Sequence, residues 1–288
     1  MRVVGIIPAR LRSTRFPAKP LALLCGRPMI QHTFEAACKA SSLHQVFVAT
    51  DSTEIAAAIQ SPPQALMTSD TCENGTARVL DALRQLEGTP FDIVVNIQGD
   101  EPLVDPAHID LCVQALADDP SCVMSTLMAP IHDEADARSP HVVKCVADRH
   151  SNAMYFSRAM IPASKDNVFA PDRFMKHIGL YAFRRPFLVD VFPTLEALHA
   201  SEDLEQLRVL EAGFKIKMVR VASAAPGVDL PSDVAKIEQL LTRGPIIISD
   251  VDDVAKPIDW DDTREDANGV ALPRMIEAAA LDDSMWKQ

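Results

Sequence analysis

RVVGIIPARLRSTRFPAKPL, residues 2–21, decides the fold because a short apolar segment runs directly into a basic loop. Residues 2–7 have the composition of a buried strand, and the loop after them carries four cations, Arg10, Arg12, Arg15 and Lys19. Ligands of α/β sheets bind at the carboxyl ends of the strands, so this loop predicts an anion site. The alternative is a solvated connector, which the two stiffening prolines Pro17 and Pro20 disfavour.

Charge and composition narrow the function. The chain has 288 residues, 48% of them hydrophobic, and a net charge of −12, so a basic loop on this acidic background indicates a strongly anionic ligand such as a triphosphate. We expect no nucleic-acid partner, no membrane insertion and a cytoplasmic location, because no basic stripe, bilayer-length apolar run or signal peptide is present. The six scattered cysteines have no CxxC spacing, and we expect buried, reduced thiols.

Strand-like and helix-like segments alternate through the first half of the chain. Strands are predicted at residues 2–7, 45–51, 65–68 and 91–100, and helices at 28–40, 53–60, 77–87 and after Pro106. Repeated βα units of this kind predict an α/β fold, with a mostly parallel twisted sheet covered by helices on both faces. From about Cys122 longer strands at 142–148, 176–185 and 215–221 predict a smaller mixed-strand part that extends the sheet.

The last segment, residues 244–288, has a different composition, with eleven acidic and four basic residues. Its DVDD stretch, residues 250–253, is similar to a metal-binding DxD, but an acidic cluster in an acidic tail is typical of a solvated segment. We expect no catalytic role for this extension, although IIIS at 246–249 could add an edge strand.

Two aspartates are candidate metal ligands. Asp100 follows the strand at 91–100, and Asp229 follows the strand at 215–221, so both fall at the ligand edge of the sheet. Mg²⁺ takes one or two carboxylates together with phosphate oxygens. A helix cap is the alternative role, and Asp105 before Pro106 fits it better than Asp100 does. No P-loop or GxGxxG is present, so Arg10 and Lys19 are expected to hold the phosphates.

Six motifs in this order resemble one family. They are IPARLRSTRFPAKPL at 7–21, NIQGDEP at 96–102, YFSR at 155–158, KHIGLYAFRR at 176–185, LEQLR at 204–208 and PGVD at 226–229. Together they resemble 3-deoxy-manno-octulosonate (Kdo) cytidylyltransferases, the CMP-Kdo synthetases, over about residues 3–241. The resemblance implies a Rossmann-like nucleotidyltransferase that transfers CMP from CTP to the anomeric hydroxyl of Kdo with Mg²⁺. It also implies a homodimer that serves lipopolysaccharide or capsule synthesis.

The resemblance assigns roles to positions in this chain. It implies a cytidylyltransferase domain over 1–243, with a nucleotide half to about residue 120 and a sugar-acid half from 121, which also carries dimerisation. Catalytic positions would be Arg10, Lys19, Asp100 and Asp229, the last two binding metal. Nucleotide-binding positions would be Pro8, Ala9, Arg10, Arg15, Lys19, Asn74, Gly75, Gln98 and Asp100. Sugar-binding positions would be Gln98, Arg158, His177, Tyr181, Glu205 and Gln206. The alternative for YFSR and LEQLR is a purely structural role, in which their apolar residues belong to the core and Arg158 and Glu205 lie on a solvated face.

The sequence departs from the family near both substrates. NGTAR at 74–78 has Asn74 and Ala77 where the family has a hydroxyl and an acid, and Ala163 stands where an aromatic residue is frequent. An amino-Kdo, another acidic sugar or a phosphonate is therefore an alternative acceptor. A glycosyltransferase fits less well, because Lys19 suits pyrophosphate release. An inactive nucleotide sensor would not need to keep Asp100 and Asp229.

Overall fold

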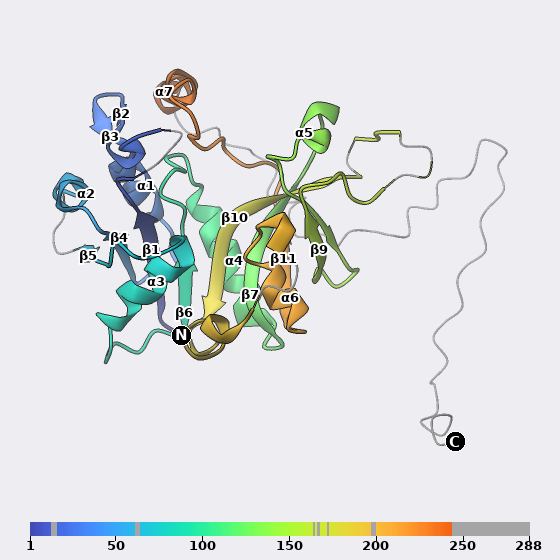
Figure 1. Ribbon diagram of the computed structural model, residues 1–288, viewed down its shortest axis with the longest axis horizontal. Coiled ribbons are helices and arrows are strands. Elements are labelled where there is room, and N and C mark those ends of the chain that lie inside the picture. Colours follow the sequence, from blue (N-terminus) through green and yellow to red (C-terminus); the bar gives the residue numbers. More distant parts are fainter. Residues whose placement is uncertain are drawn as a thin grey trace.

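A nine-stranded sheet forms the centre of the computed structural model, which describes residues 1–12, 16–60, 64–163, 165, 168–171, 173–196 and 200–243 (Figure 1). Its strands are β1 (Val3–Ala9), β4 (Gln45–Thr50), β5 (Ala65–Met67), β6 (Ile93–Asn96), β7 (Cys122–Pro130), β8 (Lys144–Ala147), β9 (Ala153–Ser157), β10 (Met175–Arg184) and β11 (Lys215–Arg220). The order is β11-β7-β10-β6-β1-β4-β5, with β8 joined to β10 and β9. β2 (Leu23–Leu24) and β3 (Arg27–Pro28) form a separate pair.

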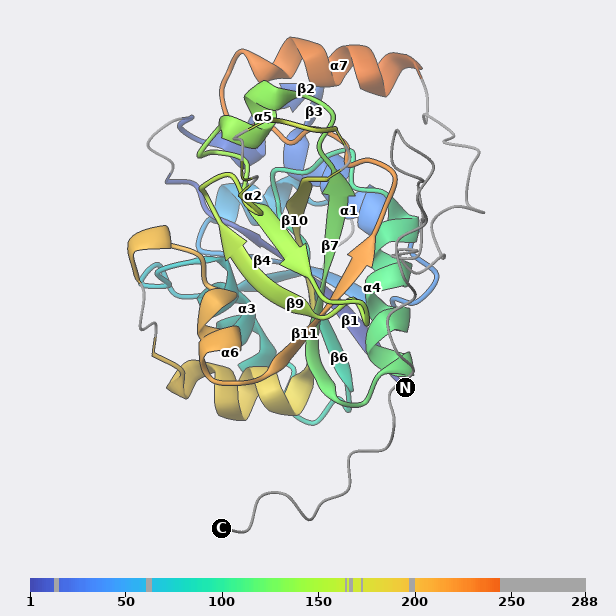
Figure 2. The ribbon, with the colours of Figure 1, turned by 90° about the vertical axis from the view of Figure 1, so that its right-hand side faces the viewer.

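Helices cover both faces of the sheet, as the sequence predicts (Figure 2). They are α1 (Met29–Ala37), α2 (Thr53–Ala58), α3 (Gly75–Arg84), α4 (Pro106–Asp118), α5 (Glu134–Arg138), α6 (Leu207–Glu211) and α7 (Asp233–Arg243). Short helical turns include η1 (Lys19–Leu21), η2 (Phe187–Val191), η3 (Phe192–Thr194) and η4 (Ala200–Glu202). Successive residues of a strand point to opposite faces of the sheet. In β1, Val3 and Ile7 therefore pack on the face covered by α1 and α4. Val4 and Ile6 pack on the other face, against α3.

Polar side chains fix the beginnings of four helices. The caps are Ser52, Asn74, Asp105 and Asp133, each of which accepts a hydrogen bond from a backbone N–H in the first turn of its helix. The predicted cap at Asp105 is confirmed, because its Oδ1 accepts from the N–H of Ala107 at 2.9 Å. Asp100 is therefore not needed to cap α4.

The sheet is parallel except for the antiparallel pairs that β10 makes and the antiparallel pair of β8 and β9. β1 pairs with β4 and β6 in parallel, β4 with β5 and β7 with β11, which confirms the mostly parallel sheet. The predicted strand at 176–185 does not extend the edge of the sheet. As β10 it lies antiparallel between β6 and β7, in the middle. Its amino-terminal half consequently lies at the same edge as the carboxyl ends of β6 and β7.

Two other expectations can be compared with the described residues. All six cysteines are unpaired, as predicted, and Cys112, Cys122 and Cys145 are buried. Cys25 and Cys38 are exposed and Cys72 is half-buried, so the expectation of buried thiols is wrong for these three. Within the described part of the chain, no helix combines the length and apolar character needed to cross a bilayer. The acidic extension, including residues 246–249 and 250–253, lies outside the described residues.

Candidate active site

Three predicted catalytic side chains meet at the ligand edge of the sheet. The Nζ of Lys19 lies 2.5 Å from Asp100 Oδ2 and 3.9 Å from Asp229 Oδ1, and it donates to the carbonyl oxygen of Val228 at 2.9 Å. The side chain of Lys19 is 16% exposed, whereas those of Asp100 and Asp229 are 36% and 68% exposed. The lysine is thus enclosed, and the two carboxylates are open to a ligand.

Close backbone packing brings these segments together. A Cβ on Gly99 would lie 2.8 Å from the carbonyl oxygen of Pro8, so only glycine lets the end of β1 pack against the residue before Asp100. The N–H of Val228 donates to the carbonyl oxygen of Asp100 at 2.9 Å, which fixes the Asp229 segment to the same loop. The short turn η1 carries Lys19 toward both carboxylates.

Four other predicted nucleotide positions lie at the end of β1 and at the start of α3. Pro8 and Ala9 end β1, and Arg10 is exposed immediately after it. Gly75 at the start of α3 approaches Pro8, since an added Cβ would lie 3.3 Å from Pro8 Cγ. Arg15 lies outside the described residues.

A polar cavity of about 560 Å³ opens beside the cluster. Five of the six predicted sugar-binding residues line it: Gln98, His177, Tyr181, Glu205 and Gln206. Asn74, Gly75 and Thr76 from the start of α3 line it too, as do the loop residues 141–143. The cavity therefore joins the predicted nucleotide side to the predicted sugar side.

A chain of hydrogen bonds crosses the cavity. Gln98 Nε2 donates to Asn96 Oδ1 at 3.4 Å, and Asn96 Nδ2 donates to Thr76 Oγ1 at 3.1 Å. Thr76 Oγ1 in turn donates to Glu205 Oε1 at 2.5 Å. Asn96 and Thr76 are each only 1% exposed. These bonds fix Gln98 and Glu205 relative to each other before any ligand enters.

An irregularity in β10 orients two of the sugar-side residues. The register between β10 and β7 shifts between Ile178 and Tyr181, and the hydroxyl of Thr126 on β7 lies 3.0 and 2.8 Å from the carbonyl oxygens of Ile178 and Leu180. The same hydroxyl lies 2.9 Å from His177 Nε2. Bulges of this kind redirect side chains beside active sites.

Tyr181 and Gln206 form a second buried polar contact of the cavity. The phenol of Tyr181 donates to Gln206 Oε1 at 3.5 Å, and Gln206 is 2% exposed. Its Nε2 is a buried donor that lacks a hydrogen-bond partner among the described residues. Buried donors are normally satisfied, so this amide is suited to a ligand oxygen.

Burial shifts the pKa of several groups that line the cavity. It lowers the pKa of His177 to about 3, so this imidazole is neutral at physiological pH. Burial, with a smaller effect from Asp100, raises the pKa of Glu101 to about 8. Burial also raises the pKa of Glu205, although the hydrogen bond from Thr76 opposes that shift. The cavity therefore holds fewer full negative charges than its carboxyl groups suggest.

Arg158 is the predicted sugar-side residue that the structure does not bring into the cavity. Its Nε donates to the carbonyl oxygen of Glu202 at 2.9 Å and its Nη1 to that of Pro140 at 3.1 Å. Among the described lining residues the permanent cation is Lys176. Ala163 is exposed and does not line the cavity either.

The NGTAR segment, which departs from the family pattern at Asn74 and Ala77, makes local contacts that hold the start of α3. Asn74 accepts from the N–H of Ala77 at 2.8 Å, which is the bond a capping hydroxyl would make. Arg78 is 2% exposed and pairs with Asp51 at 3.0 Å. This segment thus keeps the start of α3 in place without the family's hydroxyl and acid.

Sequence reasoning missed several residues of the site. Thr76, Asn96 and Thr126 act through bonds to residues distant in sequence. Thr126 lies in no motif, whereas Thr76 in NGTAR and Asn96 in NIQGDEP were quoted without being given a role. Glu101 was visible within QGDEP but was not separated from Asp100. Lys176 was likewise part of KHIGLYAFRR without being assigned.

Fold and site together define an α/β nucleotidyltransferase, with a basic loop, a carboxylate pair and an adjoining polar cavity. The chain belongs to the cytidylyltransferase family, whose sequence model matches residues 4–216.

Relatives within the family are similar over most of the chain. A 3-deoxy-manno-octulosonate cytidylyltransferase of Desulfatibacillum aliphaticivorans is 49% identical over 243 residues, covering 84% of this chain and 99% of the relative. The mitochondrial enzyme of that name from Arabidopsis thaliana is 47% identical over 244 residues, covering 83% of each chain.

Solved structures agree with the fold. A CMP:2-keto-3-deoxy-manno-octonic acid synthetase complexed with CTP has a TM-score of 0.78 and 37% identity, covering 84% of this chain and 99% of that one. A 4-diphosphocytidyl-2C-methyl-D-erythritol synthase from Anaerococcus prevotii, at 14% identity and a TM-score of 0.56, shares the fold over 84% of this chain and 96% of its own.

Proposed function

We propose that this protein transfers CMP from CTP to the anomeric hydroxyl of Kdo and releases pyrophosphate. The observation that carries the proposal is the ion pairing of Lys19 with both Asp100 and Asp229, next to the cavity lined by Gln98, Glu205 and Gln206. The relatives named above, at 47–49% identity over most of the chain, support the same reaction. The lipopolysaccharide or capsule pathway and a cytoplasmic location follow from this proposal.

The triphosphate would bind at the basic loop. Lys19 is a point charge already enclosed by protein, and Arg10 adds an exposed guanidinium at the end of β1. Charge-assisted bonds from such groups to phosphate oxygens are about twice as strong as neutral ones. The close approach of Gly75 and Gly99 to Pro8 leaves the loop backbone near the ligand.

Asp100 and Asp229 fit Mg²⁺. Both carboxylates lie near the same lysine ammonium, at 2.5 and 3.9 Å, and both are open to solvent. Two carboxylates with the remaining positions left to phosphate and water are usual for Mg²⁺. When bound, the ion would supply positive charge opposite the phosphates. Lys19 would hold the two carboxylates in place.

The acceptor would bind in the cavity and needs no protein nucleophile, because its own hydroxyl attacks the α-phosphate. Gln98, at the junction of both sides, would position that hydroxyl. The Nε2 of Gln206, which has no hydrogen-bond partner among the described residues, would donate to a sugar oxygen. Positioning and fixed dipoles are the main sources of rate in such transfers.

The acceptor carboxylate needs a cation, because leaving it desolvated and unpaired costs several kcal/mol. Arg158, the group expected to pair with it, is held by the carbonyl oxygens of Pro140 and Glu202. We therefore assign this contact to Lys176, which lines the cavity.

A homodimer is part of the proposal. Within the described residues β8 is the one strand that pairs with β9, so the other edge of β9 is open. Its Met154 and Tyr155 are 62% and 43% exposed. An exposed edge with large apolar side chains favours pairing with a second copy. Light scattering at micromolar concentration tests this, and a mass of one chain would contradict it.

Pyrophosphate release from CTP tests the reaction. We expect turnover of Kdo. We expect no turnover of neutral sugars of the same size, because they lack the carboxylate. An amino-Kdo, another acidic sugar and a phosphonate form the remaining arms of the panel. Turnover of a neutral sugar with the kcat/KM of Kdo would refute the assignment, and no turnover with any acceptor would indicate an inactive nucleotide-binding homologue.

A further inference from the structure

A buried lysine lies behind the cavity, outside the catalytic cluster. Lys144, the first residue of β8, is 0% exposed. Its Nζ donates to the carbonyl oxygens of Ser139 at 2.7 Å, Val142 at 2.5 Å and Arg158 at 2.6 Å. An ammonium has three donors, and here all three are used. The lysine thereby joins the loop before β8 to the end of β9.

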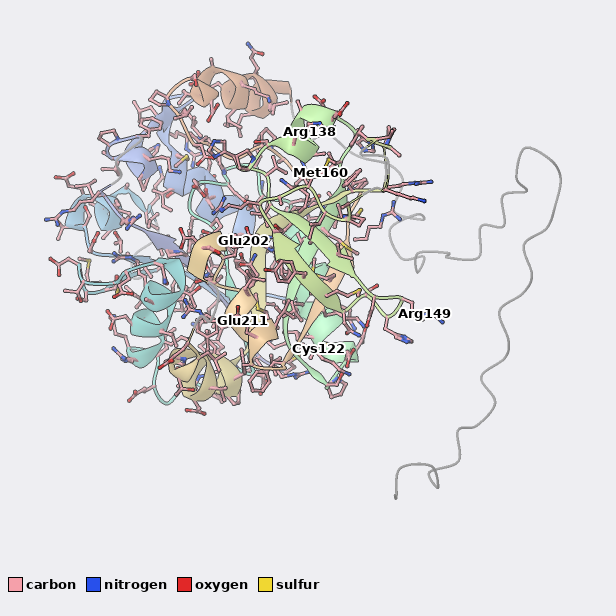
Figure 3. All side chains as sticks on the ribbon, turned by 45° about the vertical axis from the view of Figure 1, so that its right-hand side comes forward. Cys122, Arg138, Arg149, Met160, Glu202 and Glu211 are labelled. Atoms are coloured by element: carbon pink, nitrogen blue, oxygen red, sulfur yellow. The ribbon has the colours of Figure 1, made fainter. Side chains whose placement is uncertain are left out.

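Glu202 of η4 binds the same end of β9 from the other side. Its Oε1 accepts from the hydroxyl of Ser157 at 2.6 Å, and its Oε2 accepts from the N–H of Arg158 at 2.8 Å. Arg158 returns a bond through its Nε to the carbonyl oxygen of Glu202, and its Nη1 reaches that of Pro140. Figure 3 shows Glu202 beside the hairpin of β8 and β9, far from Arg149 at the turn.

Both segments joined in this way are walls of the cavity. The loop before β8 contributes residues 141–143, and the chain after Glu202 contributes residues 203–206, which include Glu205 and Gln206. Neither Lys144 nor Glu202 lines the cavity itself. The nucleotide side, by contrast, is built from β1, η1, the loop after β6 and the start of α3. Within the described residues, the side-chain hydrogen bonds of Lys144 and Glu202 go to Ser139, Val142, Ser157 and Arg158, outside these segments.

We propose that Lys144 and Glu202, acting through Arg158, are positioning residues that hold the two acceptor walls of the cavity in register. The inference rests on the proposed function, because it takes this cavity as the acceptor site. It assigns Arg158 to the cluster that supports the walls. Loss of the cluster should therefore weaken use of the acceptor and leave binding of CTP unchanged.

Glu202→Ala is the decisive variant, since Glu202 is partly exposed and its loss leaves the core intact. We expect the KM for Kdo to rise about tenfold, with kcat at saturating Kdo within about threefold of wild type. The Kd for CTP, measured by calorimetry, should not change. Glu202→Gln keeps one acceptor oxygen for the N–H of Arg158, and its NH2 can donate to the hydroxyl of Ser157, so this variant should restore most of the loss.

Asp119→Ala is the matched control. Asp119 also accepts from a serine hydroxyl and a backbone N–H, both of Ser121, and pairs with a lysine, Lys217, at 3.2 Å. It does not line the cavity, so its removal should leave the KM for Kdo unchanged. Lys144→Met, if it folds, should also raise the KM for Kdo and leave the Kd for CTP unchanged. If it does not fold, Glu202→Ala alone decides.

A KM for Kdo within about twofold of wild type in Glu202→Ala would overturn the inference. An equal loss of CTP affinity, or an equal effect in Asp119→Ala, would overturn it too, because the residues would then act on general stability. A wild-type protein that turns over no acidic sugar would refute the proposed function and this inference together. Active wild type with an unaffected Glu202→Ala would refute the inference alone.

Discussion

Replacing Asp100 with asparagine tests the carboxylate pair directly. The substitution keeps the size of the side chain and removes one of the two negative charges that face Lys19. A neutral asparagine binds Mg²⁺, and the ammonium of Lys19, far more weakly than a carboxylate does. Catalysis should therefore suffer while the fold remains.

The expected effect of Asp100→Asn on stability is smaller than its expected effect on catalysis. The ion pair of Lys19 and Asp100 is partly open to solvent, with the two side chains 16% and 36% exposed, so its loss should cost at most about 1 kcal/mol of unfolding free energy. Loss of a metal carboxylate should lower kcat at least about 100-fold, equivalent to about 2.7 kcal/mol in the activation barrier.

The assay is pyrophosphate release with CTP and Kdo over a Mg²⁺ titration, together with urea unfolding. Asp105→Asn is the control, because Asp105 lies in the same loop and caps α4, a role that asparagine fills equally well. Asp105→Asn should match wild type in both measurements. Turnover of Asp100→Asn within about threefold of wild type would refute the metal assignment.

Three further predictions follow from the described geometry. Lys19→Ala and Arg10→Ala should each weaken CTP binding about tenfold or more by calorimetry, since each removes a charge-assisted bond of about 1.5–3 kcal/mol, and unchanged affinity in both would make the loop a solvated connector. Gly99→Ala should lower the free energy of unfolding by about 1–3 kcal/mol in urea, because its Cβ would lie 2.8 Å from the carbonyl oxygen of Pro8, and wild-type stability would contradict that packing. Burial lowers the pKa of His177 to about 3, so the unfolded chain binds a proton there below about pH 6.5 while the folded chain stays neutral. Stability should fall as the pH is lowered from about 6.5 toward 3, and His177→Asn should lose part of that slope; identical slopes would show that His177 does not contribute.

Local sequence patterns predicted the elements that carry their own signal. The apolar runs at 2–7, 45–51, 65–68 and 91–100 became β1, β4, β5 and β6, and Asp105 before Pro106 became the cap of α4. Hydrophobic period and capping chemistry are properties of a few consecutive residues, so they can be read without a structure.

Pairing between distant segments could not be read in this way. The antiparallel insertion of β10 between β6 and β7 depends on which strands meet, and its residues would look the same at a sheet edge. The bulge opposite Thr126, which directs His177 and Tyr181, arises from that pairing.

The sequence by itself determined the α/β class, the basic loop and the carboxylates at the strand ends, because each follows from local composition and from the rule that ligands bind at those ends. Tertiary structure alone decided which side chains share the cavity. It placed Lys19 against Asp100 and Asp229, which are 81 and 210 positions away, and held Arg158 against backbone carbonyls outside the cavity. Such contacts depend on backbone paths set by packing of the whole core, and no local pattern encodes them.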